Sequence, residues 1–598
     1  MQIKNRCEIE DKYKWDLGKI YKNEDEISKD IEEVKIKTNE FIQFQGKLTE
    51  NANNLLSAIE LQFSIIRILD KLIVYSNMKY HEDQACSKSK TLMGKIDKLS
   101  NEIFEKLAFF TPELLESDYD KILGFIKEEK NLKTYEHVLE DVFREKEHSL
   151  SIKEEEMLAR LGEVLAGYED VYTSLDDVDL SFGKITDEEE NEVEINGSNF
   201  TKYIKSNDRR VRKDTFYTFY NAYKGMQNTF SSTLKGSVDV DTFVSNTRKY
   251  ESVLQMSLYS DNIDTKLYDK LINKVNDSLD ILHKYIKLRK DVLKLDDMHM
   301  YDIYAPLVKN IDKNYTYEEA KEIVINALQP LGDTYINDLT KLFESKIIDV
   351  YNNKNKHGGA YSWGCYDSMP YVLLNYEGTY NDVSTIAHEL GHSMHSYYSH
   401  KNQEYHNSSY TIFLAEIAST VNEILLNRYS YENAKTKEEK LYYLNNLLES
   451  FRTTLYRQTM FAEFEKIIHD EVQNGGILTS EYLSNTYLEL NKKYYGNDII
   501  SDEEISYEWM RISHFYNSFY VYKYATGIAI ASSIASDILN KKDNALENYI
   551  EFLSSGGKDY SLNILKNVGI DIVNDDTIDK AIKMFEDTIN EFINVLNS

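Results

Sequence analysis

Proline, glycine and cysteine are all scarce in this chain of 598 residues. Four prolines and 23 glycines are too few for a collagen-like, linker-rich or loop-dominated β protein, and a shortage of helix breakers favours long helices. The three cysteines, Cys7, Cys86 and Cys365, form no CxxC pair, which argues against a disulfide framework and against a thiolate zinc site. We therefore expect a mainly α-helical protein.

The chain also lacks long apolar runs and an excess of positive charge. It contains no run of 18 apolar residues, and its first 20 residues have no apolar core of the kind found in signal peptides. The 70 basic and 101 acidic residues give a net charge of −31, the opposite of the basic footprint that nucleic-acid-binding proteins need. We expect a cytoplasmic protein with no nucleic-acid partner and no membrane partner.

Apolar residues recur at helical spacing along most of the chain, for example over residues 56–80. A polar stretch at 186–199 contains a turn-forming Asn-Gly and predicts a short hairpin or a domain boundary. We therefore divide the chain into an N-terminal helical domain at 1–200 and a second domain at 201–598. Within the latter, the glycine- and aromatic-rich segment 357–380 predicts short strands.

The motif HELGH, which begins at His388, is the most informative feature of the sequence. On a helix, His388 and His392 lie one turn apart on one face, so both imidazoles can reach one metal ion. Glu389 projects beside them, where it can take a proton from a water molecule. Asn381 and Asp382 are good N-cap types and predict that the helix begins there. Two histidines without a metal remain the alternative.

A catalytic zinc site needs a third protein ligand. Glu416 is the only charged residue in the apolar run TIFLAEIASTVN, and a metal ion would supply the counter-charge that a buried carboxylate needs. Glu423, two turns further along, is placed to accept a hydrogen bond from a ligating imidazole. His395 shares the stripe of the two histidines, and we expect it behind the ligands or in packing. Pairing of Glu416 with an arginine or lysine stays open.

These motifs resemble those of oligoendopeptidase F, in the thimet-oligopeptidase group of zinc peptidases. The resemblance rests on IAHELGHSMHSYYS at 386–399, FLAEIASTVNE at 413–423, KHGGAYSWG at 356–364 and RISHFYNSFYVYKYATG at 511–527, and it spans nearly the whole chain. It implies a mainly α, two-lobed helical ellipsoid with a deep central channel and one Zn²⁺ ion at the channel floor. A small β-sheet is expected next to the zinc helix.

The resemblance also implies roles for single residues. His388, His392 and Glu416 would be the zinc ligands and Glu389 the general base of an endopeptidase that cuts short, unstructured peptides. His514 and Tyr524 would stabilise the oxyanion, although this segment holds other tyrosines. The residues that would bind the peptide substrate are Gly358, Gly359, Ala360, Tyr361, Tyr520 and Tyr522.

Two other functions stay open at this point. A zinc carboxypeptidase or dipeptidase of similar helical fold would need a cation for the terminal carboxylate, and Arg511 or Lys523 is available. A catalytically silent peptide-binding protein would retain the fold, but the intact Glu389 speaks against it. A His₂Glu set at this spacing favours zinc over other divalent ions.

Overall fold

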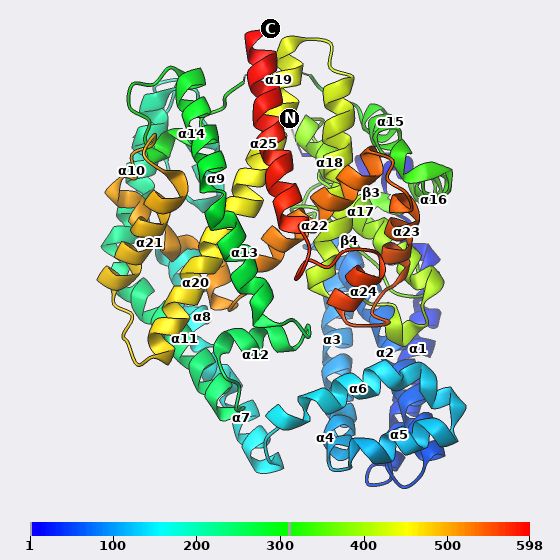
Figure 1. The fold of residues 1–598 in the computed structure, drawn as a ribbon. Helices are drawn as coiled ribbons and strands as arrows, with labels where there is room; N and C mark the ends of the chain where they lie inside the picture. Colours follow the sequence, from blue (N-terminus) through cyan, green and yellow to red (C-terminus); the bar gives the residue numbers. More distant parts are fainter. Residues whose placement is uncertain (1–2, 309–312) are drawn as a thin grey trace. The chain divides into compact units, whose positions relative to one another are not determined.

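Helices dominate the computed structural model, which describes residues 3–308 and 313–598 (Figure 1). Strands occur in only two small sheets within these residues. The prediction of a mainly α fold is therefore confirmed. No helix in the described ranges combines the length and the apolar character that crossing a membrane requires.

The chain packs into two compact units, each assembled from three separate stretches. Unit 1 comprises Met1–Ser149, Lys313–Tyr429 and Ile534–Gly569. Unit 2 comprises Leu150–Asp312, Ser430–Ser533 and Ile570–Ser598. The expected domains at 1–200 and 201–598 divide the chain along its sequence, whereas the packing units interleave segments from distant parts of it.

Unit 1 holds the first six helices of the chain and a second group from its middle and end. Its helices are α1 (Glu24–Phe41), α2 (Ala52–His81), α3 (Ser87–Leu107), α4 (Phe110–Leu115), α5 (Tyr119–Glu128), α6 (Glu136–Arg144), α15 (Tyr317–Ala327), α16 (Gly332–Glu344), α17 (Tyr380–Asn402), most of α18 (Ile412–Glu432), α23 (Ala545–Ser554) and α24 (Ser561–Asn567).

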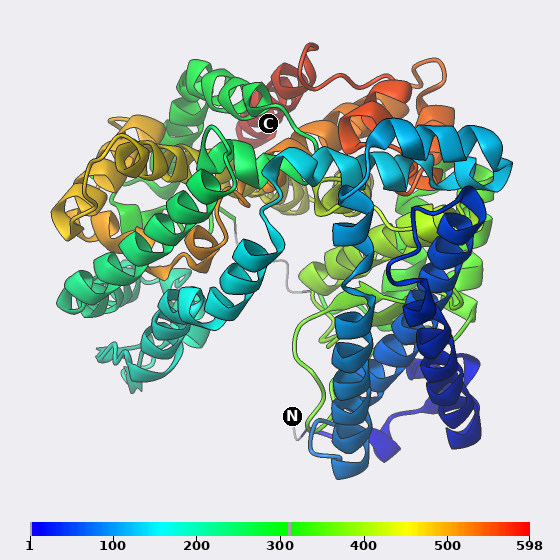
Figure 2. The same ribbon diagram turned by 90° about the horizontal axis from the view of Figure 1, so that it is seen from below.

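Helix α2 covers the segment 56–80 whose helical spacing was evident in the sequence. The Asn51 side chain caps it by accepting the backbone N–H of Asn54. Ile59 and Leu69 are buried in the core, and neighbouring apolar residues on other faces pack there as well. Helices α1 and α3 lie alongside α2, as the blue segments of Figure 2 show. Because α2 is covered from several sides, its apolar surface is wider than one stripe.

A three-stranded sheet lies next to α17 in unit 1. Its order is β3 (Ile348–Asp349), β5 (Tyr371–Leu373), β4 (Tyr361–Trp363), with β3 parallel and β4 antiparallel to the central strand. Strand β4 is an edge strand and contacts α17 (Figure 1), where Ser362 Oγ lies 2.8 Å from Ser393 Oγ. The predicted small sheet beside the motif helix is therefore confirmed.

Unit 2 contains the remaining helices and the second sheet. Its helices are α7 (Ile152–Leu165), α8 (Gly167–Ser174), α9 (Gly197–Ile204), α10 (Arg209–Gly225), α11 (Gln227–Thr247), α12 (Val253–Tyr259), α13 (Thr265–Asp277), α14 (Leu279–Leu293), α19 (Lys437–Ser450), α20 (Arg457–Gln473), α21 (Ser480–Tyr495), most of α22 (Tyr522–Leu539) and α25 (Thr577–Asn597).

The hairpin predicted at 186–199 is present, but its Asn-Gly does not form the turn. Strands β1 (Lys184–Thr186) and β2 (Glu192–Glu194) pair antiparallel, and the Asp187 carboxylate closes their loop by accepting the Asn191 backbone N–H at 2.8 Å. Asn196 instead caps α9 by accepting the Asn199 backbone N–H. An asparagine favours both a turn and an N-cap, so the dipeptide alone did not distinguish them.

Candidate metal centre

The two motif histidines lie on α17 with their ring nitrogens facing each other. His388 Nε2 and His392 Nε2 are 3.2 Å apart, as expected for residues one helical turn apart. The helix begins at Tyr380, earlier than predicted, with Thr379 as its N-cap residue. Asp382 completes the capping box from the third helical position. The expected N-cap at residues 381–382 was therefore wrong by two residues, because threonine is a good N-cap type as well.

Helix α18 brings Glu416 to the two histidines. Its Oε2 atom lies 3.5 Å from His388 Nε2 and 3.5 Å from His392 Nε2. The Ser419 hydroxyl donates to the same carboxylate oxygen at 3.0 Å. The arginine or lysine partner that the sequence left open is absent from the described ion pairs of Glu416, which join it to the two histidines. The three candidate ligands thus meet at one point.

The approach of α17 to α18 depends on Gly391, which the sequence analysis did not single out. A Cβ atom at this position would lie 2.5 Å from Ser419 Cα and 2.7 Å from the Ala418 carbonyl oxygen. Backbone atoms cannot yield as a flexible side chain can, so only glycine allows this approach. The Asn422 side chain donates to the Ala387 carbonyl at 2.9 Å and fixes the same crossing. A glycine inside a helix otherwise rich in larger residues was the available sequence signal.

Glu423 lies behind His388, as the two-turn spacing predicted. Its Oε1 atom is 3.4 Å from His388 Nδ1, the ring nitrogen that does not face Glu416. Burial alone would lower the pKa of His388, but Glu423, with further contributions from Glu389 and Glu416, raises it to about 9. Burial would likewise raise the pKa of Glu416, but the two histidines lower it to about 2. Without a metal ion, a positively charged His388 therefore lies beside a negatively charged Glu416.

The donor set fits a zinc ion in its chemistry and its spacing. Four-coordinate Zn²⁺ with ligands at about 2.0–2.1 Å separates neighbouring ligand atoms by roughly 3.3 Å. The three separations measured between the donor atoms are 3.2, 3.5 and 3.5 Å. Two imidazole nitrogens that face each other at such a distance need a shared cation or proton between them. Two histidines with one carboxylate are a typical catalytic zinc set.

Glu389 is buried beside the cluster, with 7% of its surface exposed. Burial raises the pKa of its carboxyl group, and the charges of His388 and His392 oppose that shift. Among the described residues its carboxyl group has no hydrogen-bond partner, whereas the Glu416 carboxylate is held by Ser419. Glu389 thus differs from Glu416 and Glu423, whose carboxylates pair with the histidines of the cluster.

His395 is fully buried one turn beyond His392 and stacks on the Tyr410 ring at 3.6 Å. Burial lowers its pKa to about 3, so this imidazole is neutral. The Tyr410 hydroxyl in turn lies 2.9 Å from Ser396 Oγ. The structure thus gives His395 a packing position on the helix that carries His388 and His392, which is one of the two roles expected for it.

The glycine-rich segment leads into the edge strand β4. Gly359 adopts a positive φ of 73°, a conformation that favours glycine. The Tyr361 hydroxyl is 2.8 Å from His81 Nδ1, so this ring is fixed by α2. Gly358 and Ala360 flank the turn before the strand. The four residues of this segment that were predicted to bind the peptide therefore lead into and begin a half-buried edge strand beside α17.

His514, Tyr520 and Tyr524 form a second cluster, which lies in unit 2. His514 Nε2 is 3.2 Å from the Tyr524 hydroxyl, and the Tyr520 ring packs against both side chains at 5.5 Å. Burial lowers the pKa of His514, which keeps the imidazole neutral at physiological pH. The structure thus brings together the histidine and the tyrosine that the sequence analysis paired.

The other two tyrosines of the segment point elsewhere. The Tyr516 hydroxyl lies 2.7 Å from Thr233 Oγ1, and its ring stacks on Tyr172. Tyr522, which was expected to bind substrate, is fully buried and packs against Tyr268. Neither hydroxyl therefore lies in the cluster of His514 and Tyr524.

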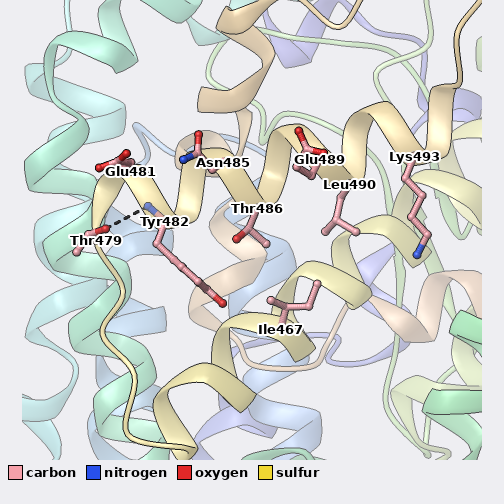
Figure 3. A pocket seen from close by; sticks show the side chains of 9 residues that line it. All are labelled: Ile467, Thr479, Glu481, Tyr482, Asn485, Thr486, Glu489, Leu490 and Lys493. Atoms are coloured by element: carbon pink, nitrogen blue, oxygen red, sulfur yellow. Dashed lines mark hydrogen bonds between the residues drawn. The ribbon is translucent and has the colours of Figure 1, made fainter.

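Unit 2 also contains a separate pocket of about 820 Å³ on α20 and α21 (Figure 3). Three charged residues, Glu481, Glu489 and Lys493, line it together with residues such as Tyr482 and Ile467. In Figure 3 the Tyr482 side chain extends toward Ile467. The Tyr482 hydroxyl donates to the Glu471 carboxylate at 3.2 Å. None of the predicted site residues lines this pocket, so we do not assign the reaction to it.

Comparison with known proteins identifies the family of the chain. The sequence profile of peptidase family M3 matches residues 202–584, and that of Oligopeptidase F matches residues 113–182. The first profile covers more than half of the chain and includes His388, Glu389, His392, Glu416, Glu423 and His514.

Named relatives extend the match over the full length. Oligopeptidase PepF of Bacillus subtilis (strain 168) is 40% identical over 595 residues, which cover 100% of this chain and 89% of that protein. Group B oligopeptidase PepB of Streptococcus agalactiae is 38% identical and covers 99% and 98%. The crystal structure of oligoendopeptidase-F from Enterococcus faecium is 33% identical with a TM-score of 0.75, covering 96% of this chain and 99% of that one. The chain therefore belongs to peptidase family M3 and is a metalloendopeptidase of the oligoendopeptidase F type.

Proposed function

We propose that this protein is a zinc-dependent oligoendopeptidase that hydrolyses internal bonds of short, unstructured peptides. The observation that carries the proposal is the triangle of donor atoms from His388, His392 and Glu416, with sides of 3.2–3.5 Å. The names of the relatives, oligopeptidase and oligoendopeptidase, support the substrate class. We also propose a cytoplasmic location, which the three free cysteines support.

The three ligands would hold the ion, and a bound zinc ion would supply Lewis acidity for the water and for the substrate carbonyl. Glu389 takes a proton from the attacking water and returns it to the leaving amine. Burial raises the pKa of this carboxyl group, which makes its carboxylate a stronger base toward the water. Glu423 accepts from His388 Nδ1 and so orients that ring.

His514 and Tyr524 would act on the substrate carbonyl. A neutral imidazole and a phenol 3.2 Å apart offer two donors to an oxygen that gains negative charge. The edge strand β4 would pair with the extended backbone of the peptide, with Gly358, Gly359, Ala360 and Tyr361 at the contact. Tyr520, which packs against both His514 and Tyr524, would contact the peptide as well.

The contacts of Arg511 and Lys523 do not favour the exopeptidase alternative. Arg511 lies 3.4 Å from Glu508, and its guanidinium group lies 5.3 Å and 5.6 Å from the ring centroids of Phe200 and Phe219. Lys523 pairs with Asp261 at 2.7 Å. A cation that already has a carboxylate partner gains less from a peptide carboxylate. Cleavage of a C-terminally amidated peptide tests the choice: the proposal expects internal cuts that a chelator abolishes, whereas loss of terminal residues from free peptides only would refute it.

A further inference from the structure

Phe519 has a backbone conformation that is unusual for its residue type. Its φ is +58°, in the left-handed region, where an L side chain with a large ring is disfavoured. The other eight non-glycine residues with positive φ in the described ranges are lysines, asparagines and one glutamate, all exposed. Phe519, in contrast, is buried, with 1% of its surface exposed. Such a conformation persists only where the surroundings impose it.

Glu465 on α20 holds the backbone of this residue. Its Oε1 atom accepts the Phe519 N–H at 2.9 Å, and its side chain is fully buried. The second carboxyl oxygen has no hydrogen-bond partner among the described residues, and burial raises the pKa of the group well above its usual range. Glu465 is therefore a neutral acid whose one structural hydrogen bond goes to the left-handed residue.

Further helices of unit 2 contact the two-residue turn that Ser518 and Phe519 form. The Ser257 hydroxyl of α12 donates to the Ser518 carbonyl at 2.8 Å. The Ser518 hydroxyl donates to Asp241 of α11 and lies 3.2 Å from His469 Nε2 of α20. The Phe519 ring packs on His469 at 4.7 Å and on Tyr268 of α13 at 5.4 Å. Four helices thus fix a turn of two residues.

The turn lies between His514 and Tyr524 in the sequence, and the 3.2 Å contact of these two side chains requires the chain to fold back between them. Tyr520, the next residue, packs on both rings. We propose that Glu465 is a positioning residue for the reaction: by holding Phe519 in the left-handed conformation, it sets the distance between His514 and Tyr524. This inference rests on the proposed function, because it requires that the pair act on the substrate.

The test compares Glu465→Leu, which removes the acceptor, with Glu465→Gln, which keeps an acceptor oxygen at the same place. Thr459→Val on the same helix is the matched control, because the Thr459 hydroxyl bonds only to Leu455 of its own helix. We expect Glu465→Leu to lower kcat about 10–100-fold with KM changed less than about threefold. The reason is that displaced hydrogen-bond donors of His514 and Tyr524 would stabilise the transition state less, while the peptide would still bind. Glu465→Gln and Thr459→Val should stay within about threefold of the parent.

Two further measurements separate positioning from general stability. Zinc content should be unchanged in every variant, because the candidate ligands belong to unit 1 and Glu465 to unit 2. In a Tyr524→Phe background, Glu465→Leu should lower kcat by less than about threefold more, since the group it positions is already gone. A parental kcat for folded Glu465→Leu, or losses that multiply fully in the double variant, would overturn the inference.

If Glu465→Leu fails to fold, the Ser257→Ala variant tests whether this turn positions the catalytic pair. It removes one hydrogen bond to the same turn from a partly exposed hydroxyl, and we expect kcat to fall about 3–10-fold at constant KM. An unchanged kcat there would overturn the inference. Failure of the proposed function is distinct: it would appear as a parent enzyme that cuts no peptide, or as a normal kcat for Tyr524→Phe, which would overturn the role of the pair and this inference with it.

Discussion

The metal cluster in unit 1 and the His514–Tyr524 cluster in unit 2 are built in different ways. In the first, two of the three ligands lie one turn apart on a single helix, so helical geometry alone brings them together. In the second, the two side chains lie ten residues apart across a turn that four helices hold. Helical spacing thus determines the histidine pair of the first cluster, whereas tertiary contacts bring Glu416 to that pair. Tertiary contacts determine the second cluster as a whole.

Substitution of the base in the first cluster should give the largest effect. We expect Glu389→Gln to keep its zinc and to lose activity by more than the ~10²–10⁴ typical of acid–base catalysis, because Glu389 also positions the water. Metal analysis and kcat on an internally quenched peptide measure both quantities. His392→Ala is the contrasting variant, since it should lose the ion itself. A zinc-loaded Glu389→Gln enzyme with more than a few per cent of parental activity would refute its role as base.

The second cluster should respond less strongly. Tyr524→Phe removes one hydrogen-bond donor and keeps the ring, so kcat should fall about 10²–10³-fold with KM and the melting temperature nearly unchanged. Tyr516→Phe is the matched control, because that hydroxyl bonds to Thr233. Equal activity of the two variants would show that the Tyr524 hydroxyl does not act in the reaction.

This contrast explains which parts of the site were predictable from the sequence. His388 and His392 were predictable because helical spacing alone brings them together, and Glu416 was a candidate because it is the one charge in an apolar run. The crossing of α17 and α18 that carries Glu416 to the two histidines was not predictable, because it depends on contacts of Gly391 and Asn422 with the other helix. The pairing of His514 with Tyr524 came from a family resemblance, since spacing cannot rank four tyrosines in a segment that is not one helix. Neither route could reveal Glu465, whose contact to Phe519 spans 54 residues.

The same limit applies to the fold. Helix content followed from few breakers and regular apolar spacing, and α2 was identified over most of its length. The interleaving of three stretches in each unit depends on contacts between distant helices, which periodicity does not encode. The sequence contains 47 tyrosines, and the role of buried ones among them is visible only in the structure. Buried phenols such as Tyr285 and Tyr487 donate to the carboxylates of Glu449 and Glu508.

Gly391 provides a test of how the first cluster depends on packing. Because a Cβ at this position would meet the α18 backbone at 2.5 Å, Gly391→Ala should lower the free energy of unfolding by about 1–3 kcal/mol and weaken zinc binding. Gly94→Ala is the control, since a Cβ on this exposed α3 residue meets nothing within 4 Å. It should stabilise the protein by up to about 1 kcal/mol. Equal stability of the two variants in chemical denaturation would exclude a glycine-dependent crossing.

The smallest expected effect is the pH dependence of zinc affinity, which concerns the charge state of the first cluster. The pKa of His388 in the metal-free protein is raised to about 9 by Glu423 and its neighbours, although burial opposes the shift. A ligating imidazole must be neutral, so below pH 9 zinc binding releases this proton. The association constant should therefore fall about tenfold for each unit that the pH drops from 9 to 7, as measured by competition with a chelator. The Glu416 carboxylate adds no slope there, because its pKa of about 2 keeps it ionised.

Glu423→Gln sharpens this last measurement. Removing the charge that raises the pKa of His388 should flatten the profile between pH 7 and 9. The loss of a hydrogen-bond partner behind the ligand should also weaken zinc binding about 10–100-fold at pH 9. A parental slope in Glu423→Gln would mean that another group supplies the released proton. A parental affinity at pH 9 would show that His388 keeps its orientation without Glu423, so that helical geometry alone fixes the ligand pair.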